Sequence, residues 1–222
     1  MIVSNKHPII AREGWLFVAI GFLLLFSSLL FFHLAFIVLF TLALIALLFI
    51  YRDPARIVPS SPLGIVSPID GRIMSITKVD NAYCGEPSLL ISLQAATLGV
   101  YSVRSPIEGK MLKQWQSDEN GARKYLNWVQ TDEGDNVVWT ALLSSKKHAY
   151  CYVQPGERIG QGQRCGFLPF GVKVELLIPG NSTLNLEVGS TVRAGETIIA
   201  HIVHQQGVSL MSDSTLMVEN AS

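Results

Sequence analysis

Three short segments of the chain carry side chains whose types could do acid–base or nucleophilic chemistry. They hold Asp70 in Ser67-Pro-Ile-Asp-Gly71, Ser102 beside Tyr101, and Ser190 in Gly189-Ser-Thr191. A serine hydroxyl becomes a nucleophile when a neighbouring base takes its proton, and a carboxylate can orient that base. Asp70 has the setting of a turn aspartate, Ser190 lies in a glycine-containing turn, and Ser102 lies in a predicted strand. Residue type alone therefore predicts no reaction.

Metal and thiol chemistry are not predicted either. His201 and His204 are three residues apart in a predicted strand, so their side chains should face opposite sides. The three cysteines, Cys84, Cys151 and Cys165, are odd in number and lack metal-ligand spacing. We expect reduced thiols in a cytosolic domain, no metal and no bound cofactor.

A long apolar segment must attach these residues to a membrane. Gly14–Tyr51, 38 residues, contains no Asp, Glu, Lys or Arg, and the chain has a mean hydropathy of +0.36. One helix of that length would measure about 57 Å, against a hydrocarbon core of about 30 Å. The sequence therefore favours a transmembrane hairpin with a break near Ser27-Ser28 or His33, and one long tilted helix is the alternative. His33, an ionisable residue in this segment, is expected to be solvated at the hairpin turn.

Basic residues flank the apolar segment on both sides. Lys6 and Arg12 precede it, and Arg52 and Arg56 follow it. By the positive-inside rule both ends prefer the cytoplasm, which predicts an inner (cytoplasmic) membrane protein whose soluble domain is cytoplasmic. The predicted units are 1–13 (cytoplasmic segment), 14–51 (hairpin), 52–66 (linker), 67–204 (β domain) and 205–222 (a loose tail).

The residues after Tyr51 are near neutral, with 15 Lys+Arg and 16 Asp+Glu, which argues against nucleic acid as a partner. They also contain two repeats. Ser67–Ile73 recurs as Ser105–Met111, and Val153–Gly162 recurs as Leu186–Gly195. Glycines at this spacing suit turns between short strands. The pattern predicts a mainly β fold, a duplicated barrel-sandwich of the lipoyl or biotinyl kind.

Other segments of this domain have a simpler interpretation. Leu89–Leu93, Asn136–Leu143 and Val172–Ile178 are predicted strands, whereas the polar segment Lys113–Val129 is predicted to be an exposed excursion. Four aromatic residues could either line a lipid-facing surface or pack in the core: Trp115, Trp128, Trp139 and Tyr125.

Several motifs carry a resemblance to a known family, in an order and spacing that make it fairly specific. They are Arg52-Asp-Pro-Ala-Arg56, Ser67–Gly71, Val100–Gly109, Asp118-Glu-Asn120, Val153–Gly166, Cys165–Pro179 and Val192–Ala200. Together they resemble the short, membrane-anchored bacterial and archaeal phosphatidylserine decarboxylases, over about nine-tenths of the chain.

The resemblance implies a proenzyme that cuts itself. In the family a serine after glycine attacks the preceding carbonyl, and the new N-terminus becomes a pyruvoyl group that serves as electron sink for decarboxylation. An Asp-His pair activates that serine. The matching positions here are Asp70 for the acid, Tyr101 for the histidine, and Gly171 with Val172 for the glycine and serine.

Two of these four positions depart from the family pattern. Val172 has no nucleophile, and Tyr101 is a poor general base because a phenol has an ordinary pKa of about 10. A basic pair is altered as well, to Lys147-His148. Losing nucleophile and base while Asp70 remains is the pattern expected of a catalytically silent relative.

Three functional interpretations follow, and they remain open at this point. The first is a silent relative that binds an aminophospholipid such as phosphatidylserine, forms a homo-oligomer, or modulates an active decarboxylase. The second is an active, pyruvoyl-type phosphatidylserine decarboxylase that makes phosphatidylethanolamine through a displaced serine. The third is a membrane-tethered β domain for protein–protein contacts.

Overall fold

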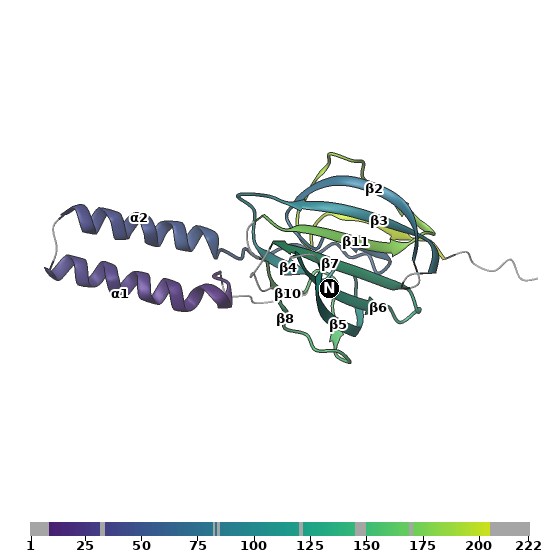
Figure 1. Cartoon of the computed structure of the whole chain (residues 1–222), viewed down its shortest axis with the longest axis horizontal. Helices are drawn as coiled ribbons and strands as arrows, with labels where there is room; N and C mark the ends of the chain where they lie inside the picture. The colour runs from purple at the N-terminus through teal and green to yellow at the C-terminus, as the bar shows by residue number, and fades with distance from the viewer. Residues whose placement is uncertain are drawn as a thin grey trace, which may run out of the picture.

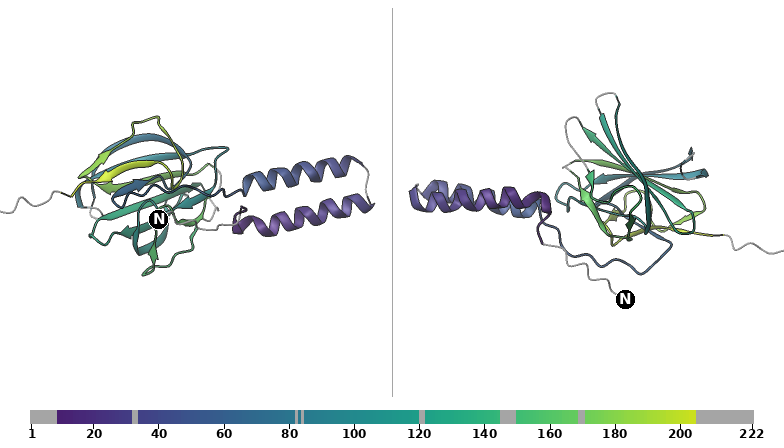
Figure 2. Two further views of the ribbon diagram at one scale, coloured as in Figure 1. Left: turned by 180° about the vertical axis from the view of Figure 1, so that it is seen from behind. Right: turned by 90° about the horizontal axis from the view of Figure 1, so that it is seen from below.

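The computed structural model describes residues 9–31, 34–81, 83, 85–119, 122–144, 150–168 and 171–204. A helical hairpin projects from one end of a mainly β domain (Figure 1; Figure 2). A short 3-10 helix, η1 (Arg12–Gly14), leads into α1 (Trp15–Phe31), and α2 (Leu34–Ile50) returns to the domain. The strands are β1 (Gly64–Val66), β2 (Gly71–Asn81), β3 (Gly85–Ala95), β4 (Ser102–Arg104), β5 (Gly109–Glu119), β6 (Ala122–Gln130), β7 (Asn136–Ser144), β8 (Tyr150–Cys151), β9 (Arg158–Ile159), β10 (Arg164–Phe167), β11 (Lys173–Pro179), β12 (Ser182–Leu184), β13 (Thr191–Val192) and β14 (Ile198–Ile202).

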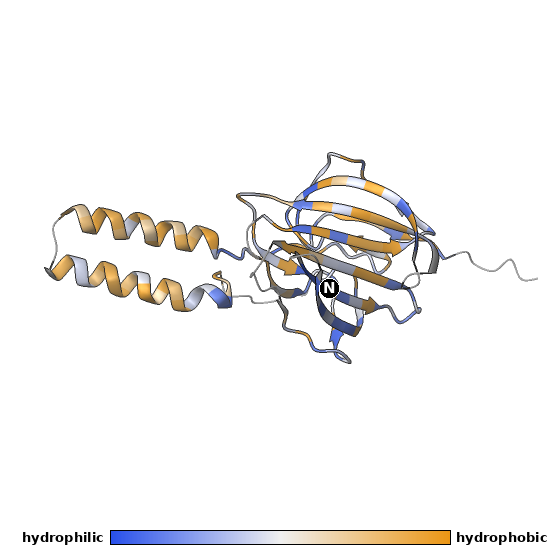
Figure 3. Ribbon diagram, in the orientation of Figure 1, coloured by the Kyte–Doolittle hydropathy of each residue, from blue (hydrophilic) through white to orange (hydrophobic). Residues whose placement is uncertain are grey.

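Both helices are rich in apolar residues, and Figure 3 shows them mainly orange, with pale stretches in α1 and hydrophilic colour at its base. Such helices are found in protein cores or in membranes, and here most of their side chains are exposed. The segment Arg12–Leu30 is long and apolar enough to cross a membrane, which indicates membrane association, and Leu34–Ile50 is shorter. The helices approach closely at Gly21, where a Cβ atom would lie 3.0 Å from Leu44 Cδ1.

The hairpin geometry decides between the alternatives for the apolar segment. Two helices are present, so the single long helix is excluded. The change of direction falls between Phe31 and Leu34, and Ser28 lies inside α1, where its hydroxyl donates to the Leu25 carbonyl at 2.7 Å. Of the two predicted positions for the break, Ser27-Ser28 is therefore wrong, and the position near His33 agrees with the ends of the two helices. His33 lies outside the described residues.

The β domain is built on one long curled sheet that forms a half-barrel. Its strand order is β13-β2-β3-β11-β7-β6-β5-β9, and two three-stranded sheets, β1-β14-β12 and β4-β10-β8, lie with it. Strands alternate between buried and more exposed residues, as in β11, where Val174, Leu176 and Ile178 are fully buried. These side chains join one core cluster with residues of all three sheets. The predicted strands in β3, β7 and β11 are confirmed.

The two sequence repeats form equivalent structures. Ser67 and Ser105 each donate a hydroxyl hydrogen bond of 2.7 Å to the carbonyl two residues later. The carbonyl of Ser67 accepts from Gly195 N at 2.8 Å, and that of Ser105 accepts from Gly162 N at 2.9 Å. The turn glycines match as well, with φ of 66° at Gly162 and 72° at Gly195. The two copies therefore share these hydrogen bonds and turn conformations, while a duplicated barrel-sandwich stays a prediction.

Two other expectations are wrong, one about the polar segment Lys113–Val129 and one about the cysteines. The polar segment Lys113–Val129 is not an excursion but forms most of β5 and β6, which pair with each other inside the long sheet. The inward side chains of β6 and the neighbouring β7 are buried because the strands alternate, so Tyr125 and Trp139 pack in the core. Trp115 and Trp128 lie half-buried, and the ring of Tyr83 contacts both of them.

Cys151 and Cys165 form a disulfide rather than two reduced thiols. The pairing of β8 with β10 brings them together, since Gly166 is the register partner of Cys151. Cys84 lies outside the described residues. With the disulfide, the cysteines no longer support a cytosolic domain, and that side assignment depends on the basic flanks alone.

Candidate functional site

Backbone hydrogen bonds bring the predicted site residues Asp70, Tyr101 and Val172 to one end of β3. The Asp70 carbonyl accepts from Ala96 N at 2.9 Å, and the Val172 carbonyl accepts from Ala95 N at 3.0 Å. Asp70 Oδ2 accepts from Val100 N at 3.2 Å, which places Tyr101 next in the chain. The three positions therefore belong to one neighbourhood, although they are far apart in sequence.

The Asp70 carboxylate is fully engaged by the fold. Oδ2 lies 2.7 Å from a guanidinium nitrogen of Arg56, and Oδ1 accepts from Ala194 N at 2.7 Å. With the bond from Val100 N, both oxygens have partners, and the side chain is only 13% exposed. Arg56 also lies 3.4 Å from Glu196. Asp70 thus connects the linker, β2 and the turn before β14.

Tyr101 is bonded to the protein rather than poised as a base. Its hydroxyl donates to the Thr97 carbonyl at 2.5 Å, and its ring lies 6.0 Å from that of Phe167. Burial raises the pKa of Tyr101 above its ordinary value of 10.0, and the nearby Arg52 charge opposes that rise. The phenol therefore stays neutral near pH 7, and a neutral phenol is a weak proton acceptor.

Val172 is 2% exposed and belongs to the hydrophobic core cluster. Gly171 precedes it with φ of 76°, a left-handed conformation that suits glycine. The Val172 carbonyl also accepts a 3.5 Å bond from the Gln94 side chain. This position holds an ordinary core side chain at the entry to β11.

Neither alternative serine is placed as a nucleophile. Ser102 is 1% exposed and donates its hydroxyl to Asp53 Oδ1 at 2.8 Å. Ser190 lies in the turn before β13, with its amide bonded to the Glu187 carbonyl and its carbonyl accepting from Ile73 N at 3.0 Å. The histidines also have local partners: His201 lies 3.2 Å from Asn185, and His204 lies 2.6 Å from Asp135.

Comparison with known proteins places the chain in a family. The family model for phosphatidylserine decarboxylase matches residues 136–200. A phosphatidylserine decarboxylase proenzyme of Nitrosomonas eutropha is 34% identical over 209 residues, covering 87% of this chain and 95% of that protein. This chain belongs to the phosphatidylserine decarboxylase family.

Other relatives agree. Proenzymes of the same name from Nitrosomonas europaea and Burkholderia mallei are 33% and 34% identical and cover 87% and 91% of this chain. They span 95% and 100% of those proteins. No solved structure matches the chain.

The family depends on a pyruvoyl group generated from its own chain, so the site can be tested for the ability to form it. Formation needs a hydroxyl at the residue after Gly171, and Val172 presents only methyl groups to the core. The residues present at this position do not fit the group, and no step through it is derived.

Sequence reasoning missed a buried ionic cluster between the hairpin and the β domain, made of Glu13, Asp53, Arg104 and Arg164. Asp53 Oδ1 lies 3.3 Å from Arg104, and Asp53 Oδ2 lies 3.1 Å from Arg164 Nε. Asp53 Oδ2 and Arg164 Nε are not aligned for a hydrogen bond, so this second contact is an ion pair only. Arg164 also binds Glu13 at 2.8 Å.

The cluster fastens both ends of the hairpin. Glu13 lies in η1 before α1, and Asp53 follows α2 by three residues. Burial lowers the pKa of Arg104, and Asp53 opposes that shift. Aromatic rings continue the junction, since Tyr51 stacks on Phe17 at 5.7 Å and on Phe167 at 5.6 Å. The signal available in sequence was the family-like Arg-Asp-Pro at the exit of the apolar segment, although it names no partner.

A hollow of about 500 Å³ lies elsewhere, beside β5, β6 and β8, and it too was missed. It is lined by Gln114, Trp115, Gln116, Tyr125, Cys151, Tyr152 and Gln154. Asp70 and Tyr101 do not contribute to it. The substituted pair Lys147-His148 and the last residue before Gly171, Phe170, lie outside the described residues.

Proposed function

We propose that this protein is a catalytically silent, membrane-anchored member of the phosphatidylserine decarboxylase family. The observation that carries the proposal is Val172, a buried valine at the family's serine position, while the hydroxyl of Ser102, the serine beside Tyr101, is buried and bonded to Asp53. The engaged carboxylate of Asp70 and the neutral Tyr101 support it, because neither of these two side chains is poised to take a proton from a hydroxyl.

In this proposal the chain works by contact with phospholipid, in the inner membrane with the β domain on the cytoplasmic side. The apolar hairpin and the basic residues at its base, Arg12 and Arg52, support membrane attachment in this orientation. Retained roles are binding of an aminophospholipid headgroup or modulation of an active decarboxylase. The filled neighbourhood of Asp70 favours modulation over a headgroup pocket at that position.

The test is the intact mass of the purified full chain under denaturing conditions. A single species of 24.4 kDa supports the proposal. A C-terminal piece of 51 residues (222 − 171) would show cleavage at Gly171-Val172, and one of 33 residues (222 − 189) would show cleavage before Ser190. Either fragment would overturn catalytic silence.

A matched pair of variants shows whether the fold could still react. Val172→Ser alone is expected to stay uncleaved, because it restores the hydroxyl without a base. Val172→Ser combined with Tyr101→His restores both family residues, and carbon dioxide release from phosphatidylserine vesicles reports activity. Activity of the unmodified protein above a Val172→Ala control would contradict the proposal.

A further inference from the structure

Exposed apolar side chains of the β domain and its entry segment gather around the base of the hairpin. We call Ile9, Trp15 and Leu98 the membrane collar; they are 82%, 57% and 70% exposed. Trp15 is the first residue of α1. Leu98 belongs to a different part of the chain, the connection between β3 and β4. Singly exposed apolar residues are common on protein surfaces, whereas apolar residues that gather in one place indicate a contact with a protein or a membrane.

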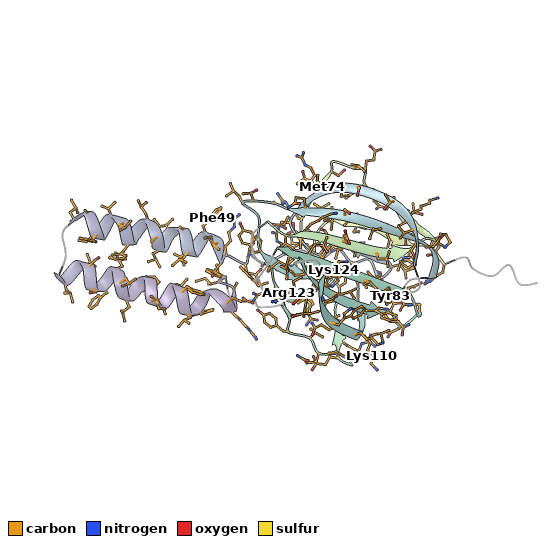
Figure 4. The ribbon with its side chains drawn as sticks, in the orientation of Figure 1. Phe49, Met74, Tyr83, Lys110, Arg123 and Lys124 are labelled. Carbon is orange, nitrogen blue, oxygen red and sulfur yellow. A yellow bond between two sulfur atoms is a disulfide. The ribbon has the colours of Figure 1, made fainter. Side chains whose placement is uncertain are left out.

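Two hydrogen bonds fix the backbone of Leu98 and of Ile9 at the level where the hairpin ends. Leu98 offers its carbonyl to the Arg52 guanidinium at 2.7 Å, and Ile9 offers its carbonyl to Asp53 N at 2.7 Å. Arg52 itself lies over the Phe49 ring at 3.9 Å, in the last turn of α2. Figure 4 places Phe49 where the hairpin meets the β domain.

The depth of this level follows from the chemistry of Trp15, at the start of α1, and Arg52, just after α2. Tryptophan rings at the ends of membrane helices lie at the headgroup level, and arginines there extend toward the phosphates. The exposed Leu98 side chain, whose backbone is hydrogen-bonded to Arg52, therefore lies beside the bilayer surface rather than in bulk solvent.

We propose that the membrane collar inserts into the bilayer interface. The hairpin end of the β domain then rests on the membrane, with the connection 96–101 at the lipid surface. The occupant is the bilayer because the collar continues the apolar surface of the hairpin, which no protein segment covers among the described residues. The proposal rests on the membrane anchoring proposed above and not on catalytic silence.

Insertion of the collar also determines the surroundings of Asp70 and Tyr101. The connection 96–101 holds Asp70 through Ala96 N and Val100 N, and it holds Tyr101 through the Thr97 carbonyl. Insertion of Leu98 therefore places Asp70 and Tyr101 immediately behind the lipid headgroups.

Spin labels on the full chain in phospholipid nanodiscs test the proposal. Single cysteines replace Leu98, Leu42 in the middle of α2, and Met74, in a Cys84→Ser background. Leu42 and Met74 are matched controls, 61% and 53% exposed, and Met74 lies away from the hairpin (Figure 4). Oxygen concentrates in lipid and a nickel chelate in water, so the ratio of their effects on the nitroxide reports depth.

The expected result is a higher oxygen-to-nickel ratio at position 98 than at 74, and the highest ratio at 42. A ratio at 98 equal to that at 74, with a lipid-like value at 42, would overturn the collar. A water-like value at 42 would overturn both the collar and the anchoring. The intact mass of the same samples tests catalytic silence independently. A cleaved chain would overturn catalytic silence and would still give depth ratios that test the collar.

Discussion

Replacing Asp53 by asparagine should strongly destabilise the protein, because it removes the central anion of the buried ionic cluster. The Asp53 side chain is fully buried and faces Arg104 at 3.3 Å and Arg164 at 3.1 Å. Breaking a buried pair by removing one partner costs about 3–5 kcal/mol, since the remaining charge is left uncompensated.

The lower end of that range applies here. Arg164 keeps Glu13 at 2.8 Å, and Arg104 keeps the carbonyls of Gly162 at 3.1 Å and Pro54 at 3.3 Å. We therefore expect a loss of about 3 kcal/mol in the free energy of unfolding. For a chain of this size that corresponds to a fall in Tm of roughly 6–12 °C.

Thermal unfolding of the full chain in detergent micelles, followed by tryptophan fluorescence, measures the effect. Asp132→Asn is the matched control, because Asp132 makes an ion pair of 2.8 Å with Arg158 at the surface, where both side chains are more than half exposed. Solvent screens such a pair, so this variant should unfold like the unmodified protein. Equal Tm values for Asp53→Asn and Asp132→Asn would refute the reasoning that burial makes the cluster important.

Two further predictions concern Tyr101 and the disulfide. Burial raises the pKa of Tyr101 in the folded state, so the neutral phenol contributes stability that is complete below pH 10 and is lost as pH rises through the folded pKa. Between pH 8 and pH 11 the Tm of Tyr101→Phe should therefore fall less than the Tm of the unmodified protein. Equal falls in Tm would argue against a buried phenol. Cys151 and Cys165 enclose a short loop, with a sequence separation of 14, so reduction or the double Cys→Ser variant should lower the free energy of unfolding by about 3 kcal/mol. Intact mass before and after reduction checks that the bond is present, and an unchanged mass would remove the basis of this prediction.

The hairpin and the main strands could be predicted because their signals are local. Uncharged apolar runs and alternating residues such as Val174, Leu176 and Ile178 determine which elements form, whatever their neighbours are. The segment Lys113–Val129 was misjudged because its many polar residues concealed the alternation of Tyr125, Asn127 and Val129, which the sheet buries.

The contacts that define the site depend on the complete fold and could not be predicted in this way. Arg164 and Glu13 are 151 residues apart, and Arg56 reaches Asp70 only because the linker folds back over the start of β2. The cysteine pair was missed because an odd count allows no unique pairing, while the register of β8 and β10 does. The positions of Asp70, Tyr101 and Val172 came from family resemblance, and the fold supplied the reason why they are neighbours.

Because β11 lies in the middle of the long sheet, a cut in the chain just before it would not separate the two fragments. β11 pairs along its length with β3 on one side and β7 on the other. Beyond it, the turn at Gly189 bonds to Ile73, and Gly195 bonds to Ser67. A nicked molecule, cut just before β11, would keep its last segment clamped in the middle of the sheet and would migrate as one body under native conditions.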